Sequence, residues 1–238
     1  MSWEGNVRKV VPYVAGEQPK EQDVIKLNTN ENPYPPAPGV AAAIRGFDCD
    51  VLRRYPDPDV SALVEALAKR HGLDKEQVFA GVGSDDVLAM SFLTFFHSGR
   101  PILFPDITYS FYDVWADLYR IPYEVQPLDD DFGIRKEDYF RENGGIVIAN
   151  PNAPTGVAAD RSVCEEIVRA NPDSVVIIDE AYVDFGGESC VPLIDRYDNL
   201  LVVQTFSKSR SMAGMRIGYA MGSRKLIRYL NDVKFSFN

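Results

Sequence analysis

A serine, a lysine and an arginine with complementary chemistry lie close together in the later part of the sequence. Ser207 and Lys208 are adjacent, and Arg216 follows a short distance further on. A lysine amine can form a Schiff base with an aldehyde, while hydroxyl and guanidinium groups can bind a phosphate. Pyridoxal 5′-phosphate carries both an aldehyde and a phosphate. Serine–lysine pairs are common, and a lysine in such a pair is more often an ordinary surface residue, so other residues must support this interpretation.

Asp179 and Tyr182 follow a buried apolar run and could bind the rest of such a cofactor. Asp179 ends the run 175–178, where a carboxylate could keep a pyridine nitrogen protonated. Tyr182 could donate a hydrogen bond to the cofactor's phenolic oxygen. The alternatives are a strand-end cap, a salt bridge or a Mg²⁺ ligand for Asp179, and a packing role for Tyr182.

Two loops rich in turn-forming residues add further candidate donors. In the loop 150–156, which contains two prolines and a glycine, Asn152 is the candidate donor to the phenolic oxygen. The glycine turn 81–86 lies between an expected strand and an expected helix, where backbone N–H groups bind phosphate. That turn lacks the third glycine of the dinucleotide fingerprint and the lysine of a P-loop. Both loops also fit a purely structural role.

The pattern of apolar residues predicts an α/β sheet that would bring these residues together. Apolar runs alternate with helical patterns, which indicates buried strands joined by helical crossovers. In such sheets ligands bind at the carboxyl ends of the strands, where the candidate residues lie. The expected strands are 78–80, 102–104, 146–149, 175–178 and 201–203, and the expected helices are 60–68, 85–96, 109–118 and 161–169.

Three further expectations concern the first part of the chain. The residues up to Gly39 are rich in Pro, Asn and Glu, which is typical of an arm or loop, with one possible strand at 24–27. Asp59 is the expected cap of the helix 60–68, and Gly72 is expected beyond its end. Arms of this kind often cross to a neighbouring subunit.

Composition narrows the classes of function. The chain has 238 residues, is 45% hydrophobic and has a formal net charge of −10, with no basic block. Nucleic-acid and polybasic membrane-binding functions are therefore excluded, and small molecules or proteins are the expected partners. No apolar run approaches the length of a membrane span, and residues 1–9 lack the apolar core of a signal peptide. Cys49, Cys164 and Cys190 suggest neither a disulfide framework nor a metal cluster, which favours a cytoplasmic location.

Taken together, the motifs resemble those of the class I and II aminotransferases, which are fold-type I pyridoxal-phosphate enzymes, and most closely the histidinol-phosphate aminotransferases. The resemblance implies an α/β fold with a three-layer αβα large domain over residues 40–238, a mostly parallel central sheet and an N-terminal arm over residues 1–39. The family continues into a C-terminal small domain beyond the position of Asn238, so we expect that domain to be absent or truncated here. The matching segments are 27–33, 54–57, 83–86, 108–110, 150–156, 179–182 and 207–208 with Arg216.

The resemblance also implies a role for each candidate residue. Lys208 would bond the aldehyde of the cofactor and later move a proton between substrate and cofactor, as both anchor and general base. Asp179 would pair with the pyridine nitrogen, and Tyr182 would bond the phenolic oxygen, which completes the catalytic set. The other cofactor-binding residues would be Asn152 at the phenolic oxygen, Tyr109 stacked on the ring, and Ser84, Asp85, Ser207 and Arg216 around the phosphate.

Further residues would act on the substrate or across a dimer interface. The family forms two-fold homodimers, and Tyr55 would reach the cofactor phosphate of the partner subunit. Tyr13 and Asn32 would contact the substrate. For Tyr55 and Tyr13 the alternative is simple packing.

The implied activity is transfer of an amino group between L-histidinol phosphate and 2-oxoglutarate, in histidine biosynthesis. The segment Asn30-Glu31-Asn32-Pro33 favours this pathway. In the family, the missing C-terminal part supplies the arginine that binds the substrate's carboxylate or phosphate. The alternatives are therefore a threonine-phosphate decarboxylase, an aromatic aminotransferase, or a truncated cofactor-binding domain without catalysis.

Overall fold

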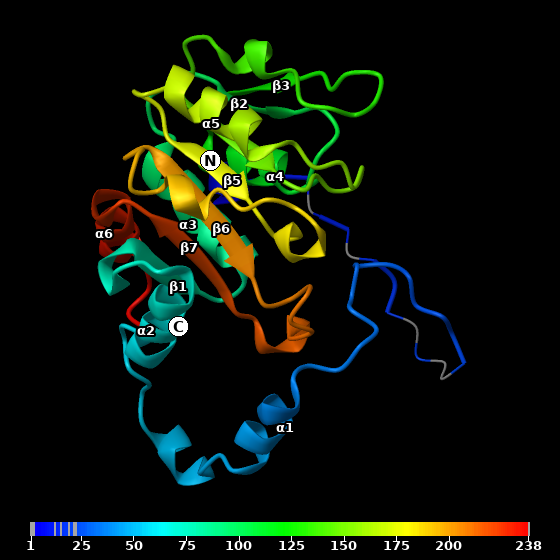
Figure 1. Cartoon of the computed structure of the whole chain (residues 1–238), viewed down its shortest axis with the longest axis vertical. Helices are drawn as coiled ribbons and strands as arrows, with labels where there is room; N and C mark the ends of the chain where they lie inside the picture. Colours follow the sequence, from blue (N-terminus) through cyan, green and yellow to red (C-terminus); the bar gives the residue numbers. More distant parts are fainter. Residues whose placement is uncertain (1–2, 12, 15, 19, 21–22, 238) are drawn as a thin grey trace.

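The centre of the computed structural model is a seven-stranded sheet in the order β1-β7-β6-β5-β4-β2-β3 (Figure 1). The structure describes residues 3–11, 13–14, 16–18, 20 and 23–237. β7 is antiparallel to both β1 and β6, and the other neighbouring strands are parallel. The mostly parallel sheet predicted from the sequence is thus confirmed. Its strands are β1 (Val78–Gly81), β2 (Ile102–Pro105), β3 (Tyr123–Gln126), β4 (Gly145–Ala149), β5 (Val176–Asp179), β6 (Leu200–Thr205) and β7 (Gly218–Gly222).

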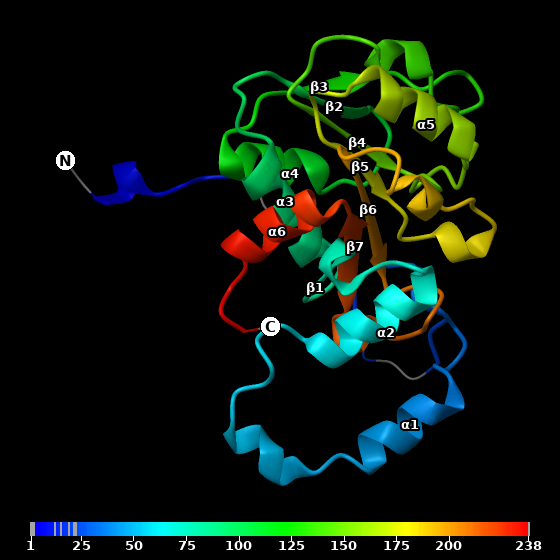
Figure 2. The ribbon, with the colours of Figure 1, turned by 60° about the vertical axis from the view of Figure 1, so that its left-hand side comes forward.

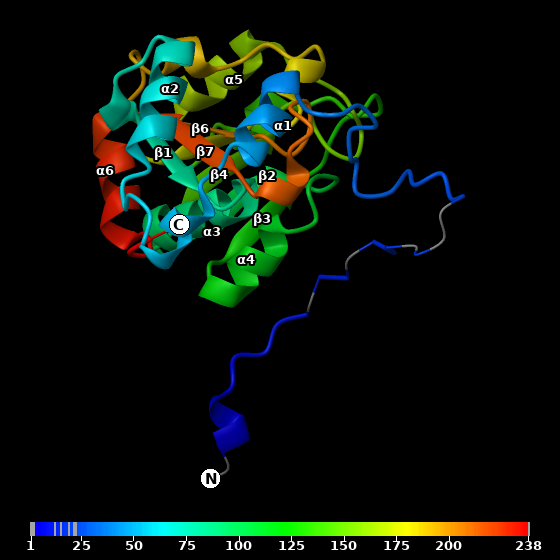
Figure 3. The same ribbon diagram turned by 90° about the horizontal axis from the view of Figure 1, so that it is seen from below.

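Helices cover both faces of the sheet and complete three layers. Figure 3 shows α2 and α5 on one face and α3, α4 and α6 on the other. Two separate clusters of buried side chains match these two faces. The helices are α1 (Pro38–Arg45), α2 (Ser61–His71), α3 (Ser84–Phe95), α4 (Tyr112–Tyr119), α5 (Arg161–Ala170) and α6 (Arg224–Val233). Short 3-10 helices span Trp3–Asn6, Cys49–Arg53, Lys75–Gln77, Lys136–Tyr139, Val183–Phe185, Val191–Leu193 and Ala213–Met215.

The central strands are continuous apolar runs because both of their faces are covered. In β5, Val176 and Ile178 pack on the α2 and α5 face, and Ile177 packs on the α3 side. All three side chains are fully buried. Burying a side chain of this size contributes about 1.5–3 kcal/mol, so a run of them holds the strand firmly between its layers. The burial of this run therefore fixes the position of Asp179, the last residue of β5, at the edge of the sheet.

Three expectations from the sequence are wrong in detail. Residues 24–27 form no strand, because Ile25 and Leu27 are each 84% exposed and meet no neighbouring strand. Asp59 does not cap α2: the Asp57 carboxylate accepts from the backbone N–H of Ser61 at 2.8 Å instead. The helix expected at 109–118 begins only at Tyr112. Gly72 does end α2, in the left-handed conformation.

Four elements were not predicted. β3 is an edge strand whose first three residues are exposed, so it has no continuous apolar run. β7 contains two glycines and one alanine, which give a weak strand signal. α1 and α6 were also missed, although the buried Leu226, Ile227 and Leu230 of α6 recur at helical spacing.

The first part of the chain lies apart from the sheet. Figure 2 shows α1 away from the helices that cover the sheet, and α1 has no buried residue. Residues 1–2, 12, 15, 19 and 21–22 of the predicted arm lie outside the described residues. The division between an arm at 1–39 and a large domain at 40–238 remains a prediction. Within the described residues, no helix is long and apolar enough to cross a lipid bilayer.

The reversed direction of β7 places its first residue at the carboxyl edge of the parallel strands. Gly218 pairs with Gly81 of β1 and with Thr205 of β6. A Cβ atom on Gly218 would lie 2.2 Å from the carbonyl carbon of Gly83 and 2.3 Å from the backbone nitrogen of Ser84. The absence of a side chain at Gly218 therefore lets β7 pack directly on the turn that opens α3.

We expect Gly218→Ala to destabilise the protein, because the new methyl group meets backbone atoms that cannot rotate away. The free energy of unfolding in urea should fall by about 1–3 kcal/mol, the usual cost of overpacking. Gly214→Ala is the matched control, since a Cβ there would have no neighbour within 4 Å. Equal stability of the two variants would contradict the close contact between β7 and the turn.

Candidate active site

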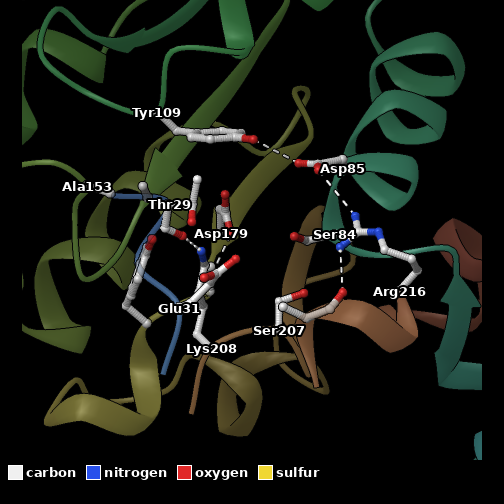
Figure 4. Close-up of a pocket in the computed structure, with 14 residues that line it drawn as sticks. Thr29, Glu31, Ser84, Asp85, Tyr109, Ala153, Asp179, Ser207, Lys208 and Arg216 are labelled. Carbon is white, nitrogen blue, oxygen red and sulfur yellow. Dashed lines mark hydrogen bonds and ion pairs between the residues drawn. The ribbon is translucent and has the colours of Figure 1, made fainter. Parts of the chain in front are cut away.

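A cavity of about 230 Å³ opens at the carboxyl edge of the sheet and brings together most of the predicted cofactor residues (Figure 4). Loops after β1, β2, β5 and β6, the segment before β7, and the N-terminal region all contribute to its wall. This is the edge at which parallel α/β sheets bind their ligands. The predicted residues that line it are Ser84, Asp85, Tyr109, Asp179, Tyr182, Ser207, Lys208 and Arg216.

Lys208 is held by residues from a distant part of the sequence. Its Nζ donates a hydrogen bond to the backbone oxygen of Thr29 at 2.8 Å. The same Nζ lies 5.6 Å from the centre of the Tyr182 ring, within the range of a cation–π contact. Asn32 Nδ2 is 3.3 Å from the backbone oxygen of Lys208. The amine is therefore fixed at one side of the cavity, between the N-terminal segment and Tyr182.

Asp179 is a buried carboxylate that faces the cavity and is only 5% exposed. Burial raises the pKa of this carboxyl to about 6, even though hydrogen bonds from Tyr112 and from the backbone of Ala181 favour the charged form. The Tyr112 hydroxyl donates to Oδ2 at 2.8 Å, and the Ala181 N–H donates to Oδ1 at 3.2 Å. Asp179 forms no ion pair with any described residue. A cationic ligand group opposite it would stabilise its charge.

The neighbouring acid, Glu180, points away from the cavity. Its carboxylate accepts hydrogen bonds from Gln204 Nε2 at 2.7 Å and from the Cys190 N–H at 2.6 Å. Burial raises the pKa of Glu180 to about 7. Two consecutive acids at the end of β5 thus face different surroundings, and only Asp179 is available to a ligand in the cavity.

The turn after β1, Ser207 and Arg216 form an anion-binding end of the cavity. Ser84 and Asp85 open helix α3, where unpaired N–H groups and the helix dipole favour a negative group. Arg216 Nη2 lies 3.5 Å from Asp85 Oδ2. Gly83 has a φ of +87°, and a Cβ there would lie 2.4 Å from Arg216 Nη2. A side chain at position 83 would therefore displace the arginine from the turn.

Tyr109 covers another side of the cavity. It lies in the loop between β2 and α4, outside the helix expected for it, and its ring is exposed to the cavity (Figure 4). Its hydroxyl donates to Asp85 Oδ1 at 2.9 Å. Burial, together with the nearby Asp85 carboxylate, raises the pKa of Tyr109. The ring is thus held as a neutral, flat surface beside the cavity, as stacking on a planar ligand requires.

Asn152 does not line the cavity in this structure, and its role at the phenolic oxygen remains a prediction. It is 4% exposed, and its Nδ2 donates to the Ile107 carbonyl at 2.8 Å and to Thr155 Oγ1 at 3.0 Å. Its Oδ1 accepts from the Thr108 hydroxyl. The amide is therefore fully used in holding the surrounding loops together, and the side chain that reaches the cavity from this loop is Ala153.

Three other predicted residues lie off the cavity wall. Asn32 bonds to the backbone oxygens of Lys208 and Ser209, so in this structure it supports the lysine loop. The Tyr13 ring lies 5.2 Å from that of Phe111. Tyr55 is 82% exposed and its ring stacks on Phe237 at 4.5 Å. The substrate roles of Asn32 and Tyr13 and the cross-subunit role of Tyr55 remain predictions.

Two polar residues of the wall were not among the predicted site residues. Thr29 contributes through its backbone carbonyl, which no side-chain pattern reveals. Glu31 lines the cavity and pairs with Lys26 at 2.6 Å, a hydrogen bond that lowers the pKa of Glu31. Both belong to a segment that matched the family motif, and this match was the only signal in the sequence that could have identified them.

The groups around the cavity fit pyridoxal phosphate. Three groups face the same cavity. The Lys208 amine suits an aldehyde, the buried Asp179 carboxylate suits a protonated pyridine, and the start of α3 beside Arg216 suits a phosphate. Gly83 and Gly218 keep the anion-binding end open to close approach, because a side chain at either position would collide with that end.

Comparison with known proteins agrees with this donor set. Residues 22–238 match the family described as aminotransferase class I and II. Over 238 residues the chain is 59% identical to a histidinol-phosphate aminotransferase of Lactococcus lactis subsp. cremoris, and the match covers 100% of this chain and 67% of that relative. The chain therefore spans about two thirds of the length of this relative.

Solved structures show the same fold. Histidinol-phosphate aminotransferase from Sinorhizobium meliloti, in complex with pyridoxal-5′-phosphate, superposes with a TM-score of 0.80 at 24% identity, over 88% of this chain and 59% of that chain. L-threonine-O-3-phosphate decarboxylase from Porphyromonas gingivalis has a TM-score of 0.71 at 22% identity, over 84% of this chain and 63% of that chain. The likeness confirms the predicted α/β fold of the large domain.

The raised pKa of Asp179 predicts how replacing this residue changes stability with pH. Because the folded-state pKa of about 6 exceeds the ordinary 3.8, the contribution of Asp179 is fully present below about pH 3.8 and is lost as the pH rises through about 6. We therefore compare the unfolding free energy of the ligand-free Asp179→Asn variant with that of the wild type. The difference should shift in favour of the variant by about 1–3 kcal/mol between pH 4 and pH 8.

Urea unfolding at the two pH values measures this difference. Asp173→Asn is the control, since Asp173 is exposed, precedes the start of β5 at the opposite end of that strand from Asp179, and does not line the cavity. If Asp179→Asn and the wild type showed the same pH dependence, the carboxylate would not carry the desolvation cost that its burial indicates.

Proposed function

We propose that this chain, which belongs to the class I and II aminotransferase family of pyridoxal-phosphate enzymes, is the cofactor-binding part of a histidinol-phosphate aminotransferase. The enzyme would transfer an amino group between L-histidinol phosphate and 2-oxoglutarate. The observation that carries the proposal is the convergence of Lys208, Asp179 and the anion-binding end on one cavity. The 59% identity to the Lactococcus relative supports the choice of substrate.

The cofactor would bind with its phosphate at the start of α3 and its ring beside Asp179. When bound, pyridoxal phosphate supplies an aldehyde that bonds to amines and a protonated ring that withdraws electrons from the reacting carbon. The backbone around Ser84 and Asp85, the Ser207 hydroxyl and the Arg216 guanidinium would hold the phosphate. These groups come from both sides of the β1–β7 pair, so the sheet itself sets their spacing.

Asp179 and Tyr109 would orient the ring. The Asp179 carboxylate would stay charged opposite the pyridine nitrogen and would keep that nitrogen protonated. Tyr112 and the Ala181 N–H hold the carboxylate in place from behind, so it needs no rearrangement to meet the ligand. Tyr109 would cover the ring and keep water from that side.

Lys208 would anchor the cofactor and then act as the general base and acid. Its Nζ would take the proton from Cα of the substrate and deliver it to C4′ of the cofactor. The hydrogen bond to the Thr29 carbonyl positions the free amine at the cavity wall. Because that partner is a single backbone oxygen, the amine can turn away from it toward a ligand by side-chain rotation.

The chain would work as a homodimer, with Tyr55 reaching the partner's cofactor phosphate, and in the cytoplasm. The exposure of Tyr55 and of nearby apolar side chains in the segment 44–55 supports an interface there: Ile44, Phe47 and Leu52 are each more than half exposed. The part of the relatives beyond this chain would supply the remaining substrate contacts.

Replacing Lys208 with Ala tests the assignment of the reactive amine. Lys208→Ala should lose borohydride-dependent attachment of pyridoxal phosphate, detected as a mass increase of the subunit, and should lose roughly 10³-fold or more in any turnover. Lys69→Ala, which removes an exposed lysine of α2, is the control. Retained turnover, or cofactor still fixed to the variant, would contradict the role of Lys208.

The same preparation separates the candidate activities. The wild-type chain should transfer an amino group from L-histidinol phosphate faster than from aromatic amino acids. Release of carbon dioxide from threonine phosphate would instead identify a decarboxylase, and bound cofactor with no turnover would identify a cofactor-binding domain without catalysis. A wild-type chain that retains no cofactor would overturn the proposal.

A mixed dimer tests whether Tyr55 acts across the interface. When Tyr55→Phe and Lys208→Ala subunits carrying different tags are co-expressed, the hybrid dimer has one cavity with both Lys208 and the partner subunit's Tyr55. The hybrid should therefore recover about half of the wild-type activity per dimer, while each parent variant stays low. No gain in the purified hybrid would place Tyr55 in its own subunit's site or in no site.

A further inference from the structure

The hydroxyl of Tyr182 accepts a hydrogen bond from a side chain that was not among the predicted site residues. Asn30 Nδ2 donates to Tyr182 Oη at 2.9 Å. Tyr182 is shared by two cavities: the candidate active site, and a neighbouring hollow of about 330 Å³ that Asn30 also lines. Asn30 does not line the active-site cavity. It therefore approaches the hydroxyl from the side away from the proposed cofactor.

The direction of this hydrogen bond determines where the Tyr182 proton can go. A phenol has one proton to donate, and its oxygen can accept hydrogen bonds as well. Because the Asn30 amide is the donor, the Tyr182 proton is not used in this contact. Within the described residues, the Tyr182 hydroxyl donates no hydrogen bond. The proton is thus available on the side of the cavity.

The backbone of the N-terminal segment is shaped to make this contact. Thr29 and Asn30 both have positive φ, at 60° and 52°. This left-handed conformation is unfavourable for a β-branched threonine and is better tolerated by asparagine. Two consecutive residues held in this way point inward together, the Thr29 carbonyl to Lys208 Nζ and the Asn30 amide to Tyr182. Strained backbone of this kind is retained where the surrounding contacts hold it in place.

We propose that Asn30 is a positioning residue that orients Tyr182 as a hydrogen-bond donor toward the phenolic oxygen of the cofactor. The inference rests on the proposed cofactor. Accepting a hydrogen bond from Asn30 also polarises the phenol and strengthens the bond that it donates in turn.

The visible absorbance of the bound cofactor reports on this oxygen without any turnover. The visible absorbance of the bound cofactor changes with pH as the cofactor loses a proton. A hydrogen-bond donor stabilises negative charge on the phenolic oxygen, so losing the donor should raise the pH midpoint of this change. Asn30→Ala should raise that midpoint by roughly 0.5–1 pH unit, the scale of one hydrogen bond. Tyr182→Phe should raise it at least as much, and the double variant should match Tyr182→Phe alone.

Asn30→Asp tests the direction of the bond. The aspartate has the same shape as asparagine but can only accept, so it would draw the Tyr182 proton away from the cavity and reproduce the full shift of Tyr182→Phe. Asn231→Ala, which alters an asparagine bonded within α6, is the control and should leave the midpoint unchanged.

Two outcomes would overturn the inference while leaving the proposed function intact. One is an unchanged midpoint in Asn30→Ala, and the other is the same shift from this substitution in the wild-type and Tyr182→Phe backgrounds. Additive shifts would mean that Asn30 acts only by holding the N-terminal segment. A wild-type chain that binds no cofactor would overturn both this inference and the proposed function.

Discussion

The burial of one carboxylate, that of Asp179, is the constraint on which the site depends. An ionised carboxylate at 5% exposure is costly, and its raised pKa reflects that cost. The fold accommodates it with donors from Tyr112 and Ala181 that hold it facing the cavity, with no described cation paired to it. The ionised form therefore destabilises the ligand-free molecule, and a cationic ligand group opposite the carboxylate would offset this cost. Binding and folding are coupled through this group.

The antiparallel β7 determines the other end of the cavity. If β7 were parallel, its first residue would lie at the far edge of the sheet and Arg216 would be remote from α3. Its reversed direction brings Arg216 beside the opening turn of α3, and two glycines remove the side chains that would separate them. Electrostatics and packing thus act together: the helix dipole attracts an anion, and close backbone contact sets the distance to the guanidinium.

The N-terminal segment is part of the site, even though the sequence suggested an arm. Thr29, Asn30 and Asn32 contact Lys208 and Tyr182 by hydrogen bonds across more than a hundred positions of sequence. Glu31 adds a charged group to the wall. Residues that hold the reactive amine in place therefore come from outside the sheet, on a segment with few buried contacts of its own. Its position depends on the site as much as the site depends on it.

The sequence by itself determined five of the seven strands of the central sheet, all except β3 and β7, and the polar residues that follow them. It could do so because continuous apolar runs record burial on both faces, and residues that follow parallel strands must meet at one edge. Only the tertiary structure decided which groups face the cavity. The Asn152 amide bonds within the surrounding loops, and the Thr29 backbone carbonyl, rather than a side chain, accepts the hydrogen bond of Lys208. The glycine-rich β7 pairs with β6 although it has no apolar pattern. Hydrogen bonds between distant segments and contacts made by backbone atoms leave no local pattern of residue types, so they become visible only once the chain is folded.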